Sequence, residues 1–188
     1  MRIIAGEMRS RKLKAPEGMD TRPTADRVKE AVFSILGSRV YGARVLDLYG
    51  GSGALALEAV SRGADSAVIC DISAKACQAI QENIVALGVG SRVRLLRMKD
   101  TAALSALQKN GDGFDLIFLD PPYRMSTVPV CQAIMEAGLL KKEGTVIVEH
   151  GRETPPEILP PLILMDHREY GATGVGFYRT EEGEKEND

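Results

Sequence analysis

Apolar runs alternate along this chain with segments that carry apolar residues at helical spacing. Five runs have the length and continuity of buried strands, and the segments between them have helical periodicity. This alternation predicts a parallel sheet with helices packed on both faces. The expected strands cover residues 45–48, 66–71, 92–97, 114–119 and 144–149, and residues 162–165 and 174–178 are expected to form a closing antiparallel pair.

The first apolar run leads into a glycine-rich turn. Gly50, Gly51 and Gly53 follow the strand, and residues from Ala54 onward resume at helical spacing. Without Cβ atoms the backbone can take positive φ, and a ligand can lie against it. The helix N-terminus would point its free N–H groups at the turn. We call residues 50–53 the glycine cradle and interpret it as a ligand site, with a ligand-free structural turn as the alternative.

Two cofactor classes use a turn of this kind. The pattern Gly51-x-Gly53-x-x-Ala56 satisfies the dinucleotide fingerprint, with Asp71 as the acid that would hold the ribose. Asp47, ahead of the glycines, would repel a pyrophosphate but can accept hydrogen bonds from an ammonium group. S-adenosylmethionine carries an ammonium and a sulfonium and no phosphate. The sequence therefore favours S-adenosylmethionine over a nicotinamide cofactor.

Two further carboxylates follow predicted strands. Asp71 ends the second strand, where parallel strands open onto a ligand crevice. It could hold ribose hydroxyls, cap the helix expected over residues 74–87, or do both. Asp100 follows the third strand and could accept a hydrogen bond from an adenine amino group.

The sequence Asp120-Pro121-Pro122-Tyr123 directly follows the fourth strand. Proline lacks an N–H and fixes φ, so the backbone must leave the sheet rigidly at this point. An exocyclic amine on an aromatic base is conjugated and weakly nucleophilic. Hydrogen bonds from its two N–H groups to the Asp120 carboxylate and the Pro121 carbonyl would favour a pyramidal nitrogen, with Tyr123 stacked on the base. The alternative is a proline-stopped loop with a surface tyrosine.

Composition limits the other possibilities. The 188 residues fit one domain, and 44% hydrophobic and 27% charged residues are ordinary globular values. Three cysteines without a CxxC pattern, and two histidines, favour neither a disulfide framework nor a metal site. No apolar run reaches membrane-spanning length, and the first residues lack a signal-peptide core, so we expect a cytoplasmic protein without a membrane partner.

Charge is distributed unevenly. Residues 1–44 hold ten Lys or Arg and five Asp or Glu, a net of +5, whereas the whole chain is −2, which leaves −7 for the remainder. Residues 1–20 are expected to form a basic β-hairpin extension, 21–180 the main domain, and 181–188 an acidic flexible tail. The basic side chains of the hairpin would contact phosphates. The alternative is that they only keep this end of the chain soluble. These basic side chains are Arg9, Arg11, Lys12 and Lys14.

An amphipathic helix is expected between the basic segment and the first strand. Thr24 is its predicted N-cap, and the predicted apolar face is Val28, Ala31, Val32, Ile35 and Leu36. Arg22, Thr24 and Arg27 lie at its start, where they could line a pocket or only cap and solubilise the helix.

Taken in order, these motifs resemble the bacterial family that methylates N2 of a guanine in small-subunit (16S) ribosomal RNA. The resemblance covers nearly the whole length. Asp-Pro-Pro-Tyr alone also occurs in DNA adenine methylases. Several members carry phenylalanine where this chain has Tyr123, and Tyr49-Gly50-Gly51 is a looser match to the usual Phe-Ala-Gly. The matching segments are 2–6, 21–30, 46–55, 120–123, 170–173 and 177–178.

The resemblance implies a class I, Rossmann-like methyltransferase fold with a seven-stranded, mostly parallel sheet. It also implies S-adenosylmethionine as donor and ribosomal RNA or an assembling small subunit as partner, and we expect a monomer. The implied catalytic residues are Asp120, Pro121, Pro122 and Tyr123. The implied donor-binding residues are Arg22, Thr24, Asp47, Tyr49, Gly51, Gly53, Asp71, Ile72, Asp100 and Thr101, and the implied RNA-binding residues are Arg9, Arg11, Lys12, Lys14 and Arg124.

In this assignment Asp47 and the glycines hold the methionine end of the donor, Asp71 the ribose and Asp100 the adenine. Asp120, Pro121 and Tyr123 orient the guanine. The target base must be splayed out of its stack to enter the pocket. Three alternatives stay open: an adenine-N6 DNA methyltransferase, a non-catalytic RNA-binding assembly factor on the same fold, and a nicotinamide oxidoreductase.

Overall fold

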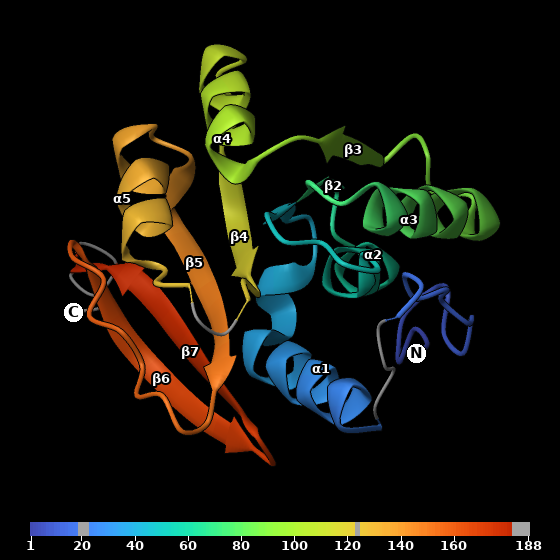
Figure 1. Ribbon diagram of the computed structural model, residues 1–188, viewed down its shortest axis with the longest axis horizontal. Coiled ribbons are helices and arrows are strands. Elements are labelled where there is room, and N and C mark those ends of the chain that lie inside the picture. The colour runs from blue at the N-terminus through green and yellow to red at the C-terminus, as the bar shows by residue number, and fades with distance from the viewer. Residues whose placement is uncertain (19–22, 123–124, 182–188) are drawn as a thin grey trace.

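A computed structural model describes residues 1–18, 23–122 and 125–181 (Figure 1). Helices and strands alternate through most of it. The helices are α1 (Pro23–Leu36), a 3-10 turn η1 (Gly37–Val40), α2 (Ala54–Ser61), α3 (Ala74–Leu87), α4 (Asp100–Lys109) and α5 (Val128–Glu136). The strands are β1 (Arg44–Asp47), β2 (Ser66–Asp71), β3 (Val93–Arg97), β4 (Phe114–Leu119), β5 (Leu140–Gly151), β6 (Leu162–Tyr170) and β7 (Thr173–Thr180).

The seven strands form one sheet in the order β3-β2-β1-β4-β5-β7-β6. The first five strands of that order run parallel to one another, and β7 pairs antiparallel with both β5 and β6. The chain starts at β1 in the middle of the sheet, proceeds to β3 at one edge, and returns to β4 on the other side of β1. The crevice at this reversal lies at the carboxyl ends of β1 and β4, where open α/β sheets bind ligands.

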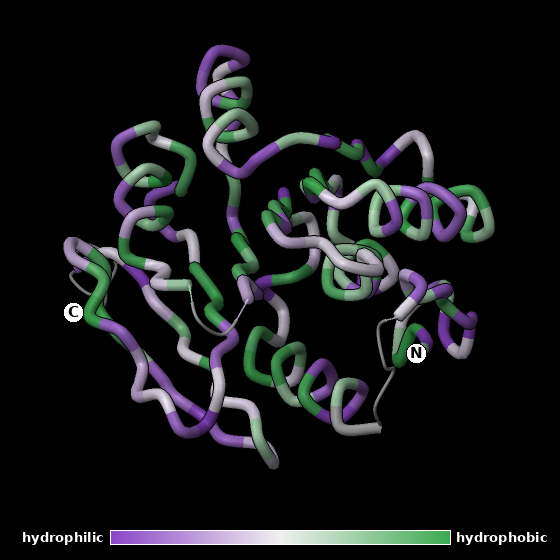
Figure 2. The backbone as a smooth tube through the Cα atoms, in the orientation of Figure 1, coloured by the Kyte–Doolittle hydropathy of each residue, from purple (hydrophilic) through white to green (hydrophobic). Residues whose placement is uncertain are grey.

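Two separate apolar cores cover the two faces of the sheet. The N-terminal segment, α1, α2 and α3 pack on one face, and α4 and α5 pack on the other. Figure 2 shows helices banded alternately hydrophobic and hydrophilic, as expected when one side of each helix lies against the sheet. The predicted seven-stranded, mostly parallel sheet with helices on both faces is confirmed, including the closing antiparallel pair.

The basic N-terminal segment is docked on the domain. Its expected hairpin is reduced to one antiparallel bridge between Arg2 and Lys12. Ile3, Met8 and Leu13 are buried in the core beneath it. Figure 1 shows the segment beside α2 and α3.

Some boundaries differ from expectation. The prediction that Thr24 is the N-cap of α1 is wrong, because the helix begins at Pro23 and Thr24 lies within its first turn; proline suits this position because its missing N–H would have no helical partner. On the same helix Phe33 and Lys29 are buried, although neither was assigned to the apolar face. The fifth strand is also longer than expected, because the structure extends it from Leu140 to Gly151.

Candidate functional site

The glycine cradle joins β1 to α2 by a turn that only glycines fit. Gly51 has φ 57° and Gly53 has φ 78°, both in the left-handed region. A Cβ on Gly50 would lie 2.3 Å from Ile69 Cγ2, too close for any side chain. Gly53 is the N-cap of α2 and offers no side chain to its N–H groups. The first N–H groups of α2 therefore remain available to a ligand or to a nearby carboxylate.

Asp47, at the end of β1, is a buried carboxylate that forms no salt bridge with any described residue. Its side chain is 1% exposed, and among the described residues its Oδ1 has no hydrogen-bond partner. Burial raises its pKa from 3.8 to about 7, and the charges of Asp120 and Asp71 add to the rise, while backbone N–H groups of Ala56 and Tyr49 oppose it. Asp47 is thus a buried acceptor whose Oδ1 is left unpaired by the described residues.

Asp71 and Asp100 are held by backbone N–H groups around the cradle. Asp71 accepts hydrogen bonds from Gly51 N–H at 2.9 Å and from Ser73 N–H at 2.8 Å. Ser73, rather than Asp71, is the N-cap of α3, since its side chain accepts from Ala76 N–H. Asp71 therefore ties the end of β2 to the cradle and keeps lone pairs free toward the crevice.

Tyr49 positions the third carboxylate. Its hydroxyl donates to Asp100 Oδ2 at 2.7 Å, and Thr101 N–H donates to Asp100 Oδ1 at 2.7 Å. Ile72, next to Asp71, exposes 61% of its surface. An exposed apolar side chain beside fixed carboxylates can cover the flat face of a bound heterocycle.

Asp120 directly follows β4 and lies at the carboxyl ends of the parallel strands, as Asp47 does on β1. Its side chain is exposed at the mouth of the site, whereas Pro121 is buried and Pro122 is exposed. Neighbouring protein atoms still displace enough water to raise the pKa of Asp120. The effect of its charge on Asp47 places the two carboxylates in one electrostatic environment. Tyr123, Arg124 and Arg22 lie outside the described residues, as does the side chain of Thr24.

A pocket of ≈ 240 Å³ opens beside the Asp-Pro-Pro segment. Glu149, near the end of β5, lines it, and the sequence reasoning missed this residue. Burial raises the pKa of Glu149, and the neighbouring charge of Asp120 raises it further. A signal was available, because a carboxylate follows the apolar run 145–148 just as Asp120 follows 114–119. The lining residues are Pro121, Pro122, Met125, Ser126, Thr127, Val148, Glu149, His150, Thr154, Pro155 and Glu157.

Four of the five basic residues assigned to RNA lie in the N-terminal segment, and their surroundings differ. Arg11 donates to the Ala86 carbonyl at the end of α3, and Lys14 pairs with Glu82 at 2.6 Å. Both contacts are exposed, so they contribute little to stability and can be exchanged for phosphates. Arg9 and Lys12 are exposed, and no salt bridge joins either of them to the described part of the chain.

A buried carboxylate anchors this basic segment. Glu58 on α2 is fully buried and accepts from Ile4 N–H at 2.8 Å and from Ala5 N–H at 3.0 Å. Arg62 pairs with it at 2.7 Å, and buried Lys29 lies 3.5 Å away. The segment is therefore attached through the protein interior.

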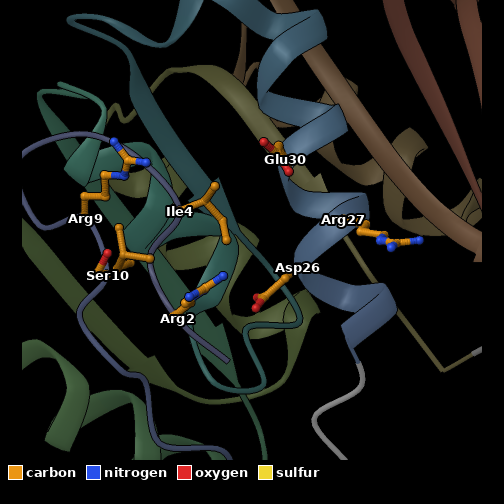
Figure 3. Close-up of a pocket in the computed structure, with 8 residues that line it drawn as sticks. Arg2, Ile4, Arg9, Ser10, Asp26, Arg27 and Glu30 are labelled. Carbon is orange, nitrogen blue, oxygen red and sulfur yellow. The ribbon is translucent and has the colours of Figure 1, made fainter.

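A second pocket, of ≈ 400 Å³, lies between the N-terminal segment and α1. In Figure 3, Arg2 and Arg9 come from the segment and Asp26 and Glu30 from the helix, while Arg27 points away from the segment. Carboxylates on the helix side offset the arginines, so this pocket has mixed charge. It differs in this from the strand-end site, which is strongly acidic.

The strand ends thus collect most predicted site residues along one edge. β1 contributes Asp47 and the cradle, β2 leads to Asp71, and β4 leads to Asp120. The described residues contain no group of three or more metal-ligating side chains. None of the helices within the described ranges is long and apolar enough to cross a membrane.

Known proteins with the same architecture match over nearly the whole chain. A family model described as "Conserved hypothetical protein 95" matches residues 1–179. "Putative rRNA methyltransferase YlbH" of Bacillus subtilis (strain 168) is 38% identical over 181 residues, spanning 95% of this chain and 98% of that protein. "Ribosomal RNA small subunit methyltransferase D" of Escherichia coli (strain K12) is 33% identical, spanning 100% of this chain and 94% of that protein. The solved structure "Putative methyltransferase yhhF from Escherichia coli" superposes with a TM-score of 0.83 at 32% identity, covering 97% of this chain and 98% of that one.

Proposed function

The chain belongs to the family described as Conserved hypothetical protein 95, and from that premise we propose that it transfers a methyl group from S-adenosylmethionine to the exocyclic N2 of a specific guanine in small-subunit ribosomal RNA. One observation carries the proposal. Asp47, a buried carboxylate that pairs with no described cation, lies at the same end of the parallel strands as the proposed acceptor pair Asp120 and Pro121. The names of the Bacillus and Escherichia relatives support ribosomal RNA as the substrate.

The residues present fit S-adenosylmethionine. The orphaned Oδ1 of Asp47 would accept from the ammonium group of its methionine end. The positive φ of Gly51 and Gly53 gives the tight turn that would bring backbone N–H groups and the start of α2 up to the donor. Asp71 would accept from the ribose hydroxyls and Asp100 from the adenine amino group, with Ile72 against the ring. When bound, this donor supplies an electrophilic methyl group on a sulfonium sulfur.

The rest of the chemistry is positioning. Asp120 and the Pro121 carbonyl would accept the two N–H bonds of the guanine amine and aim its lone pair at the methyl carbon, with Tyr123 stacked on the base. Such alignment replaces a bimolecular encounter by a held geometry. As N2 forms its bond to carbon it must release one proton. The raised pKa of Asp120 makes this carboxylate a better proton acceptor than an ordinary aspartate, and water is the other route.

Residues 1–20 would act as the RNA-binding extension of the domain 21–180. Arg9, Arg11, Lys12 and Lys14 would contact phosphates, with Arg124 near the substrate and Arg22 and Thr24 over the donor. We propose a cytoplasmic monomer that acts on free ribosomal RNA or on an assembling small subunit.

Methyl transfer from labelled S-adenosylmethionine tests the proposal. The substrates are ribosomal RNA and small subunits from a strain that lacks this protein, and DNA serves as the competitor. Digestion to nucleosides should yield N2-methylguanosine from the ribosomal substrates alone. Label in N6-methyladenine, or in DNA only, would move the substrate to the DNA adenine class while keeping the donor.

A further inference from the structure

A second carboxylate lies beside Asp120 at the strand ends. β5 runs parallel to β4, and Leu119 pairs with Val148, so the next residues on the two strands are Asp120 and Glu149. Adjacent strands are about 4.8 Å apart. The two side chains are close enough that the charge of Asp120 raises the pKa of Glu149. The sheet register thus sets two acceptors side by side.

Glu149 also faces a cavity. It lines the pocket of ≈ 240 Å³ together with Pro121 and Pro122, the residues next to the proposed amine-binding position. Glu157 lines the same pocket, but Ser126 Oγ and Thr127 N–H both donate to its carboxylate at 2.6 Å. No described residue donates a hydrogen bond to the Glu149 carboxylate, which therefore keeps its acceptor capacity for a ligand.

The two purine classes present different atoms to such a pair of acceptors. The Watson–Crick edge of guanine carries the N1–H donor next to the N2 amine, whereas adenine carries a bare N1 acceptor next to its N6 amine. Enzymes that extrude a base read this edge by hydrogen bonds. Two neighbouring carboxylates match the two neighbouring donors of guanine. With adenine, the bare N1 would face an ionised carboxylate, and neither of these two acceptors would find a donor.

We propose that Glu149 accepts a hydrogen bond from N1–H of the target guanine and so makes the site select guanine over adenine. This inference rests on the proposed N2 methylation, because it assumes that Asp120 and Pro121 hold the N2 amine. Burial and mutual repulsion disfavour two ionised carboxylates in the free protein. The N1–H and N2–H donors of guanine would favour the ionised pair, whereas the N1 lone pair of adenine can be met only by a protonated Glu149. The selection is therefore expected where Glu149 is ionised, above its raised pKa of about 8.

The test removes the N1–H from the substrate and the carboxylate from the protein. 2-Aminopurine keeps the amine at position 2 but lacks N1–H and O6. The wild-type protein and Glu149→Gln are each assayed for methyl transfer to small subunits that carry guanine or 2-aminopurine at the mapped target. At a pH above about 8, where Glu149 is ionised, the wild-type protein should prefer guanine by on the order of 10- to 100-fold in kcat/KM. The glutamine amide can donate to a bare N1, so Glu149→Gln should reduce that preference to within a few fold.

Because loss of O6 affects both proteins alike, the change in preference isolates the N1–H contact. Glu153→Gln, an exposed carboxylate nearby in sequence, is the matched control and should keep the wild-type preference. Glu149→Gln should also bind S-adenosylhomocysteine as tightly as the wild-type protein, since Glu149 is assigned to the base.

Two results would overturn the inference while leaving the proposed function intact. One is a wild-type protein that methylates guanine and 2-aminopurine within twofold of each other, a result that needs no variant to fold. The other is a folded Glu149→Gln that loses activity equally on both substrates. If the wild-type protein forms no N2-methylguanosine at all, the proposed function fails, and this inference fails with it.

Discussion

Replacing Asp47 by asparagine should stabilise the ligand-free protein and abolish donor binding. The carboxyl is 1% exposed, and its pKa is raised from 3.8 to about 7. A shift of that size corresponds to about 4 kcal/mol of unfolding free energy, at ~1.4 kcal/mol per pKa unit. The asparagine amide leaves a buried N–H unpaired, which lowers the unfolding free energy by roughly 2 kcal/mol. The net gain is therefore about 2 kcal/mol, or roughly 4–8 °C in Tm for a chain of this size.

The sign of the stability change caused by Asp47→Asn depends on pH. The folded-state pKa of Asp47 lies above its unfolded value, so the ionised carboxylate destabilises the fold fully above pH 7. The penalty fades as pH falls from about 7 toward 4, where both states become protonated. Asp47→Asn should therefore gain most over the wild type near pH 8. It should lose that gain near pH 4.5, where the penalty it removes has fallen below the cost of the unpaired amide N–H. Asp120 and Glu149 titrate in both proteins, so the difference between them reports mainly Asp47.

Thermal and urea unfolding at several pH values, with calorimetric titration of S-adenosylhomocysteine, measure the two effects. Asp65→Asn is the control, because Asp65 is an exposed carboxylate just before β2, at the opposite end of the first βαβ unit from Asp47; it should change neither. Asp47→Asn with reduced stability at pH 8, or with unchanged ligand affinity, would refute the reasoning. Stability gained together with binding lost would identify Asp47 as a residue held in a strained electrostatic state for its ligand.

Two further predictions concern the N-terminal segment. Glu58→Gln should lower the unfolding free energy by about 3 kcal/mol, because it removes the negative charge between Lys29 and Arg62 inside the protein. Urea unfolding measures this change. A loss below about 1 kcal/mol would contradict the role of Glu58 as a buried anchor. A double Arg9→Ala and Lys12→Ala variant should weaken RNA binding and make its salt dependence shallower, with an unchanged Tm; a filter-binding salt titration measures this, and an unaltered slope would assign RNA binding elsewhere.

The fold could be predicted from the sequence because its strongest signals are local. Continuous apolar strands, the glycine cradle and the Asp120-Pro121-Pro122 segment each depend on residues adjacent in the chain. Their meeting at one sheet edge follows from parallel strands ending together. Most of the described residues assigned to donor and base could therefore be placed along that edge without any knowledge of contacts.

Glu149 and Glu58 could not be recognised in the same way. Glu149 can be recognised as a neighbour of Asp120 only once β5 is known to lie next to β4, a pairing between separate segments of the sequence. Glu58 reads as an ordinary helical charge until the N-terminal segment is placed on α2, where it receives two backbone N–H groups. Lys29 is hidden for the same reason, since its burial depends on the segment that covers α1. Long-range packing decides all three.

Asp120 gives the most direct test of the central claim. Ribosomal RNA from a strain that lacks this protein is compared, by nucleoside mass spectrometry and site mapping, after complementation with the wild-type protein or with Asp120→Asn. The account predicts N2-methylguanosine at a single small-subunit position with the wild-type protein. It predicts a loss of at least about 100-fold with a variant that still folds and binds S-adenosylhomocysteine. Full methylation by Asp120→Asn, or no N2-methylguanosine with the wild-type protein, would contradict the account.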